Sequence, residues 1–300
     1  MEFLRNLVLS RLAAALEANG NYRVLRRLTP QAQFRSGAPQ HPFIGIILDT
    51  ETTGMNPGAD EVIELGMLKF EYGQDGQIFR VLDSFNRLQQ PSDPIPPHIT
   101  AITGITDREV AGQSIDAAEV EAFLSGAGLI IAHNAKFDRP MCEAKWAFFR
   151  NFNWACSCTQ IPWKDEGHEG VKLGYLLNDY GRFHNGHRAI DDCHALLYLL
   201  AQPVQESRRL AMALLLDNAR KAQYQLWAEN APFDFKDILK HRGYRWNPDL
   251  RCWSLILDET ALAAEEEYLF REIYGDRQVQ LRKDKLTARN RFSLMPSGNS

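Results

Sequence analysis

Residues 43–54 have the sequence FIGIILDTETTG, in which an uncharged, mostly apolar run leads directly into two acidic residues. The run predicts a buried strand. Side chains alternate between the two faces of a strand, so Asp49 and Glu51 project from one face at its end. Neighbouring carboxylates repel, and burying them costs free energy unless a cation or protons intervene. Oxygen ligands of this kind favour Mg²⁺ or Mn²⁺.

A D-x-E triplet at a strand end is common, and alone it fits a solvated edge better than a metal site. Polar segments further along the chain favour the metal site. Residues 133–138 (HNAKFD) lie between a short apolar strand and a helix, and residues 187–192 (HRAIDD) precede an apolar helix that ends before Pro203. Strands followed by alternating strands and helices indicate a mixed sheet covered by helices.

These segments resemble the motifs of the DEDD-type 3′→5′ exonucleases with a catalytic histidine. That family includes the epsilon proofreading subunit of bacterial DNA polymerase III, exonuclease X, ribonuclease T and oligoribonuclease. Its motifs D-x-E-T-T-G, H-N-x-x-F-D and H-x-A-x-x-D match residues 49–54, 133–138 and 187–192 in order. The resemblance spans residues 41–202. It implies an α/β, ribonuclease H-like fold with a mixed sheet flanked by helices.

The resemblance implies a site with two divalent cations, Mg²⁺ or Mn²⁺. Asp49, Glu51 and Asp192 would hold one ion. Asp49 would bridge to a second ion, to which Asp138 contributes. The family pattern selects Asp192 over the adjacent Asp191 and makes His187 the general base. The residues expected to contact or orient the terminal nucleotide are Thr52, Thr53, Gly54 and Asn134.

Each motif residue also has a purely structural interpretation. His187 alone fits a helix cap, or a bond to a backbone carbonyl, better than a base. His133 is better explained as a turn residue at a strand end, and Asp191 as a solvated residue that favours the helix dipole. Thr52 to Gly54 could form a simple turn, in which the glycine permits close approach of a ligand.

Composition narrows the class of protein. Of 300 residues, 45% are hydrophobic and 24% charged, as in ordinary globular proteins. No apolar stretch is long enough to span a membrane, and no signal peptide is evident. The odd number of cysteines, without a CxxC pair, predicts a reduced cytoplasmic protein. A zinc site formed by Cys156, Cys158, Cys193 and His194 is a weaker alternative, because its spacing matches no common zinc pattern.

Charge is unevenly distributed along the chain. The net charge is −4, yet both ends are basic, so the middle of the chain carries an acidic excess. Basic ends around an acidic body fit a protein that binds a polyanion and concentrates carboxylates on metal. Solvated basic tails explain the same pattern equally well.

Four regions are expected. Residues 1–40 form an N-terminal helical extension and linker, with helices at 3–18 and 22–28, the first packed on the body. Residues 41–202 form the exonuclease domain. Residues 203–276 comprise a long helix at 204–229 and a small α+β accessory module. Residues 277–300 form a basic flexible tail. We expect truncation after residue 202 to leave the active site intact.

The accessory module interleaves basic and aromatic residues at 242–246 (RGYRW) and 251–253 (RCW). This pattern fits single-strand binding, although a small core with buried tryptophans explains it slightly better. The resemblance implies nucleic acid with a free 3′ end as substrate, with DNA favoured over RNA, and a polymerase or repair protein as partner. An RNA-trimming enzyme and a non-catalytic nucleic-acid-binding protein are the alternatives.

Overall fold

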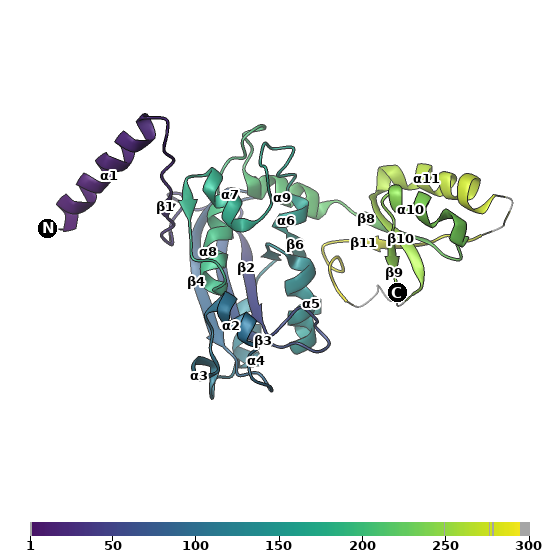
Figure 1. Cartoon of the computed structure of the whole chain (residues 1–300), viewed down its shortest axis with the longest axis horizontal. Coiled ribbons are helices and arrows are strands. Elements are labelled where there is room, and N and C mark those ends of the chain that lie inside the picture. The colour runs from purple at the N-terminus through teal and green to yellow at the C-terminus, as the bar shows by residue number, and fades with distance from the viewer. Residues whose placement is uncertain (1, 249, 276, 278, 295–300) are drawn as a thin grey trace.

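The computed structural model describes residues 2–248, 250–275, 277 and 279–294. Its central sheet has the strand order β4-β3-β2-β5-β6, with β2 at the centre (Figure 1). The first three strands pair antiparallel, and β5 and β6 run parallel to β2. This is the mixed sheet of the ribonuclease H-like fold. Its strands are β2 (Phe43–Thr52), β3 (Val62–Tyr72), β4 (Ile78–Leu88), β5 (Leu129–Ala132) and β6 (Trp154–Cys156).

Two apolar clusters cover the two faces of this sheet. One contains side chains of α7, α8 and α9 and the inward residues Ile47 and Leu68. The other contains side chains of α4 and α5 with Ile46 and Leu48. Because β2 is buried on both faces, its apolar run is continuous rather than alternating. The helices are α4 (Ala117–Leu124), α5 (Ala135–Lys145), α7 (Leu173–Asp179), α8 (Ala189–Leu200) and α9 (Ala211–Arg220).

Short elements complete the body of the molecule, residues 26–220. Helices α2 and α3 lie between β4 and α4, and η1 and α6 flank β6. Strand β7 pairs with β1 in a small parallel sheet. The bounds are β1 (Arg26–Arg27), α2 (Pro97–Thr103), α3 (Asp107–Val110), η1 (Ala147–Asn151), α6 (Ser157–Gln160) and β7 (Arg182–Phe183).

The predicted long helix at 204–229 is wrong. Helix α9 ends at Arg220, and residues 223–228 form strand β8. The Leu-rich part remains helical and packs in the core, whereas the following segment, QYQLWA, begins with alternating polar and apolar residues. Its pairing partner β10 lies far along the chain. Alternation with a long-range partner favours a strand, and helical periodicity alone could not reveal it.

A second domain-like unit follows, the C-terminal module (Figure 1). Its antiparallel sheet has the order β11-β8-β10-β9, and α10 and α11 pack on one face of it. The core of this face includes Leu226, Tyr244 and Leu269. The bounds are β8 (Gln223–Ala228), η2 (Phe233–Phe235), α10 (Lys236–His241), β9 (Arg245–Asn247), β10 (Cys252–Asp258), α11 (Glu259–Tyr268), the π-helical η3 (Leu269–Tyr274) and β11 (Arg282–Leu286).

The predicted flexible tail at 277–300 is also wrong over most of its length. Strand β11 pairs with β8, and the following turn, residues 287–293, returns to the exonuclease body. There Arg139 of α5, 1% exposed, donates to the backbone oxygens of Arg289 (2.7 Å) and Arg291 (2.8 Å). A buried guanidinium needs acceptors, and the backbone of this turn supplies them. Residues 295–300 lie outside the described residues.

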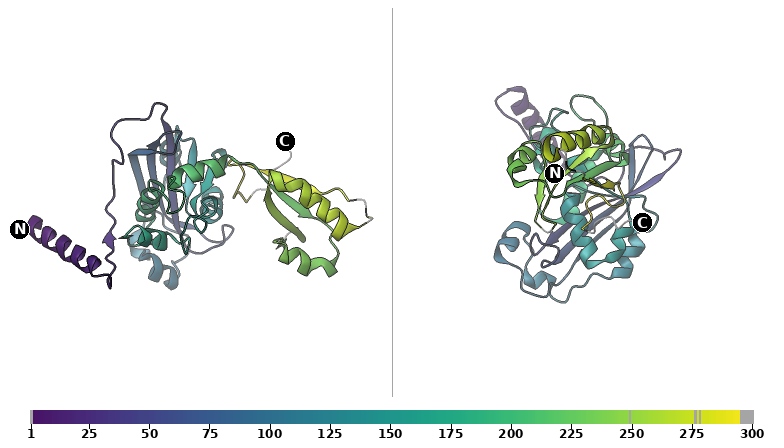
Figure 2. Two further views of the ribbon diagram at one scale, coloured as in Figure 1. Left: turned by 90° about the horizontal axis from the view of Figure 1, so that it is seen from above. Right: turned by 90° about the vertical axis from the view of Figure 1, so that its right-hand side faces the viewer.

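The N-terminal helix α1 (Glu2–Ala18) forms as predicted but does not pack on the body (Figures 1 and 2). The large apolar side chains from residue 7 onward are exposed: Leu7, Val8, Leu9, Leu12 and Leu16. Apolar residues lie around much of its circumference, so no single stripe directs it onto the body. The predicted helix at 22–28 is wrong, because residues 26–27 pair with β7.

Candidate active site

Three of the predicted ligands meet at one edge of the central sheet. Asp49 and Glu51 project from the end of β2, and Asp192 projects from the first turn of α8. One carboxylate oxygen of each lies within 4.8 Å of the other two. The i, i+2 spacing on a strand and the start of a helix thus bring together three acids that are far apart in sequence.

Asp138 joins this group from α5. It is 2% exposed, and its Oδ1 accepts hydrogen bonds from the Thr50 backbone N–H (3.1 Å) and the Thr50 hydroxyl (2.9 Å). Thr50 lies between Asp49 and Glu51, so β2 itself holds the fourth carboxylate. The charge of Asp138 contributes to the raised pKa values of both Asp49 and Glu51, which places it within electrostatic reach of them.

Burial and mutual repulsion disfavour the charged form of these carboxylates and raise their pKa values. Burial, followed by the charges of Asp138, Asp192 and Glu51, raises the pKa of Asp49 well above its usual range. Burial and then the charge of Asp192 raise the pKa of Glu51 to about 8. Burial raises the pKa of Asp138 to about 7, although the hydrogen bonds from Thr50 oppose the shift. A divalent cation would remove this penalty, and an all-oxygen donor set suits one.

The start of α8 is fixed against β3 by close packing and by an ion pair between Arg188 and the buried Glu64. A Cβ at Gly66 would lie 2.6 Å from the backbone carbonyl carbon of Ala189, so only glycine permits this approach. Glu64, fully buried, accepts from the Ala189 backbone N–H (3.0 Å) and from Arg188 Nη2 (2.9 Å). These contacts place Asp192, one turn further on, opposite Asp49.

Asp192 is held from two directions. Nε2 of His184 lies 2.7 Å from its Oδ1, and the backbone N–H of His187 donates to its Oδ2 at 2.8 Å. His184 is an orienting residue that the motifs did not reveal, because it lies outside them in the preceding β7–α8 loop. A carboxylate fixed in this way is preorganised for ligation.

The His187 side chain is exposed, and its backbone has a φ of 67°. A non-glycine residue in this left-handed region is unusual and strained. The hydrogen bond from its backbone N–H to Asp192 holds the residue there. The backbone of His187 therefore adjoins Asp192. Among the described residues, neither ring nitrogen of its imidazole has a hydrogen-bond partner.

The residues expected to contact substrate border the same edge. The Thr52 hydroxyl donates to the Gly54 carbonyl oxygen at 2.6 Å, and the Thr53 hydroxyl accepts from the backbone N–H of Glu61 at 2.9 Å. These bonds order the loop after β2. Asn134 is exposed at the start of α5. His133 is structural, because its ring bonds Ser157 and the Val171 carbonyl oxygen.

Sequence reasoning missed four residues that support the cluster: Thr50, Glu64, His184 and Arg188. A charged residue within the otherwise apolar start of β3 (VIELGML) is the one signal that could have identified Glu64. The others are ordinary in sequence and acquire their roles through contacts between segments distant in the chain.

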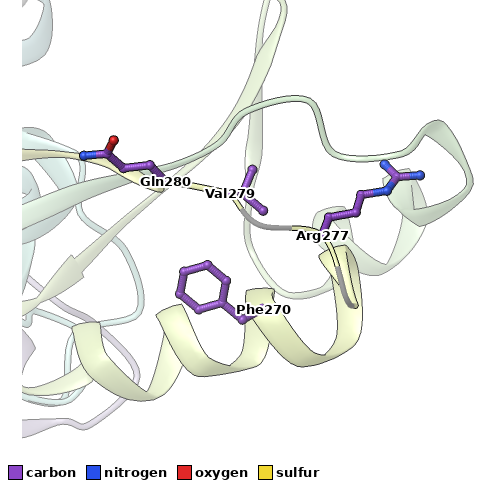
Figure 3. Close-up of a pocket in the computed structure, with 4 residues that line it drawn as sticks. All are labelled: Phe270, Arg277, Val279 and Gln280. Atoms are coloured by element: carbon purple, nitrogen blue, oxygen red, sulfur yellow. The ribbon is translucent and has the colours of Figure 1, made fainter.

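The zinc alternative is not supported. Cys156 packs in the cluster on one sheet face and Cys193 in the cluster on the other. Within the described residues, the one metal-competent group of His, Cys and acidic side chains is the acidic triplet. A pocket of about 540 Å³ at the outer end of the C-terminal module is lined by Phe270, Arg277, Val279 and Gln280 (Figure 3). It contains none of the predicted catalytic residues.

Residues 46–200 match the model of the exonuclease family RNase_T, and this stretch covers just over half of the chain. The chain belongs to this family. The sequence resemblance to the DEDD-type 3′→5′ exonuclease family is thereby confirmed. Family membership and the acidic cluster together indicate dependence on a divalent metal ion.

Among curated proteins, the exonuclease is similar to the PolC-type DNA polymerase III of Staphylococcus aureus, with 28% identity over 178 residues. The match covers 56% of this chain but only 12% of the polymerase. Among solved structures, exonuclease X in complex with 5′-overhanging duplex DNA is 24% identical, with a TM-score of 0.39. The match covers 58% of this chain and 89% of the exonuclease X chain. A zinc-bound Escherichia coli exonuclease I–single-stranded DNA complex is 16% identical, with a TM-score of 0.48, and the match covers 82% of this chain and 63% of the exonuclease I chain.

The part of the chain that the structure describes contains no helix that is long and apolar enough to cross a membrane.

Proposed function

We propose that the exonuclease hydrolyses the terminal phosphodiester at the 3′ end of DNA and releases nucleoside 5′-monophosphates. The convergence of Asp49, Glu51 and Asp192 within 4.8 Å carries this proposal. Asp138, held by Thr50, completes the four-carboxylate set. No structural role requires so many buried or partly buried acids together, since their repulsion lowers stability.

In this mechanism the four carboxylates would hold two divalent cations, Mg²⁺ or Mn²⁺. When bound, these ions would supply Lewis acidity and offset the negative charge of the scissile phosphate. Asp49, Glu51 and Asp192 would be the ligands of one ion, and Asp49 and Asp138 would contribute to the other. Thr52, Thr53, Gly54 and Asn134 orient the terminal nucleotide.

His187 acts as the general base. Its side chain is exposed, its backbone N–H donates to Asp192, and a neutral imidazole accepts a proton from water in this kind of catalysis. The free ring nitrogen takes the proton from the attacking water. The hydrogen bond from its backbone N–H to Asp192 supports this role, because it couples the base to the ligand set.

The similarity to a DNA polymerase supports DNA as the substrate class and a polymerase or repair protein as partner. The test is a time course on matched, 5′-labelled single strands of DNA and RNA, with Mg²⁺, with Mn²⁺ and with EDTA. We expect a ladder of shortened DNA products and mononucleotide release only with metal. Faster hydrolysis of RNA would overturn the DNA assignment. Binding of both strands without mononucleotide release would overturn the enzymatic role.

A further inference from the structure

The C-terminal module is attached to the exonuclease body at two places. Residues 221–222 lead from α9 into β8, and the turn at 287–293 returns from β11 to the body. This turn is fixed by bonds from Arg139 to its backbone and by the Ser293 hydroxyl, which donates to Glu143 at 2.7 Å. Two attachments restrain the position of the module relative to the body more than one linker would. They therefore hold the two sides of the gap between module and body at a defined separation.

A cleft of about 950 Å³ lies in that gap. One wall is the sheet face of the module opposite α10 and α11. Strand register places Gln225, Ile256 and Asp284 on this face. The other wall comes from the body and includes Lys136 of α5, Gln160 of α6 and the segment after α9. The cleft is an open groove between the uncovered sheet face of the C-terminal module and the helical surface of the body.

The charges that line the cleft leave a net positive balance. Asp284 accepts from Arg282 at 2.9 Å, and Asp258 lies within electrostatic reach of Arg291. Lys136 and Lys221 are exposed, and neither forms an ion pair with a described residue. Two uncompensated lysines in a groove attract a polyanion more strongly than a neutral partner.

The sheet face offers both polar and apolar contacts. It carries the amides Gln223, Gln225 and Asn247 and the apolar side chains Trp227, Leu286 and Ile256, the last of which is 54% exposed. Amides bond base edges, and exposed apolar surface supports unstacked bases. The lysines beside this mixed surface favour a polyanion over a neutral partner.

The cleft adjoins the active site through α5. Lys136 lines the cleft, and Asp138, two residues further on, joins the acidic cluster. The two residues are ~3 Å apart along the helix axis and on different sides of a helix ~10 Å wide. At ~3.4 Å per stacked nucleotide, about three nucleotides span that width.

We propose that this cleft holds the single strand of the substrate a few nucleotides from the 3′ end that enters the active site. The inference rests on the proposed function. The groove then binds the strand through phosphate contacts to Lys136 and Lys221 and base contacts to the sheet face around Ile256. It gives the enzyme affinity for a polymer beyond its terminal nucleotide.

The test uses the full chain with Lys136→Gln, Lys221→Gln and Ile256→Glu, and with Lys240→Gln as the matched control on α10, which packs on the opposite sheet face. Affinity for a fluorescent single strand of about 20 nucleotides, longer than one typical binding site, is measured in EDTA over a salt series. Each lysine variant should lower the slope of log Kd against log salt by ~0.7, the value for one lost phosphate contact. Ile256→Glu should weaken binding, and Lys240→Gln should leave it unchanged.

Hydrolysis of a dinucleotide with Mg²⁺ separates this inference from the proposed function. The variants should cleave the dinucleotide at the wild-type rate, because it is too short to reach the cleft, while KM for the long strand rises. Wild-type salt slopes and KM in the cleft variants, with normal dinucleotide cleavage, would overturn the cleft inference alone. Failure of the wild type to cleave either substrate would overturn the proposed function, and the binding series would still test the cleft.

Discussion

Asp192 and Asp191 are adjacent residues with opposite surroundings. Asp192 is partly buried and accepts two hydrogen bonds within the acidic cluster, whereas Asp191 is exposed. We expect Asp192→Asn to lower kcat by ~10²-fold or more, the range for loss of one electrostatic contact in a transition state. Asp191→Asn should retain wild-type turnover. Steady-state hydrolysis of a labelled strand measures both, and equal losses would contradict the ligand assignment.

The two histidines beside Asp192 should differ in their effects. His187→Gln should lower kcat by ~10²–10⁴-fold, as for loss of a general base, while affinity for metal persists. His184→Gln should instead weaken metal binding, because His184 orients Asp192. Titration with Mn²⁺ and a pH–rate profile separate these outcomes. A normal profile in His187→Gln would remove it as the base.

Without metal, the acidic cluster should make stability depend on pH. The pKa of Glu51 is raised to about 8 and that of Asp138 to about 7, so the folded state holds protons that the unfolded state releases near pH 4–4.5. Stability from these protons is present at low pH and is lost as pH rises through 7 to 8. Tm in EDTA should therefore fall over this range, less steeply in Glu51→Gln. A flat profile in EDTA would contradict the raised pKa values.

At the scale of elements, the contact between α8 and β3 decides whether the ligands converge. Gly66→Ala places a Cβ against the backbone of Ala189 and should push the start of α8 away. We expect a loss of about 1–3 kcal/mol in stability, as for overpacking, together with weaker metal binding. Gly174→Ala in α7 is the matched control, because nothing lies near its Cβ and alanine favours a helix. Thermal melts with and without Mn²⁺ compare the two.

At the scale of the whole molecule, the chain's C-terminal turn completes the exonuclease body. Arg139 is buried beside the cluster residue Asp138, and its acceptors are Glu143 and backbone oxygens of residues 288–291. Truncation after residue 202 would remove several of these acceptors, as well as α9, which packs in the core. The structure therefore argues against the expectation that residues 41–202 alone retain an intact active site.

Truncation after Leu286 tests this turn directly. We expect it to cost ~1–3 kcal/mol, the range for a buried polar group that loses its acceptors, and to weaken metal binding through α5. Arg139→Ala in the full chain should cost ~3–5 kcal/mol, because it leaves the buried Glu143 without its ion-pair partner, whereas Arg108→Ala, which removes an exposed side chain, should change stability little. Denaturant unfolding measures all three. Wild-type stability of the truncated chain would show that the turn is dispensable.

The sequence by itself predicted the acidic residues that gather at one edge of the sheet and the apolar strand β2 that carries two of them. Asp49 and Glu51 share a face because strand periodicity is local, and the order of the three motifs fixed the family. Tertiary structure decided what depends on contacts between distant segments. The alternating segment at 223–228 became β8 only by pairing with β10, and the basic C-terminal segment became ordered because buried Arg139 needed its carbonyl oxygens. His184 and Glu64 likewise acquired their roles only when folding brought Asp192 and the start of α8 to them.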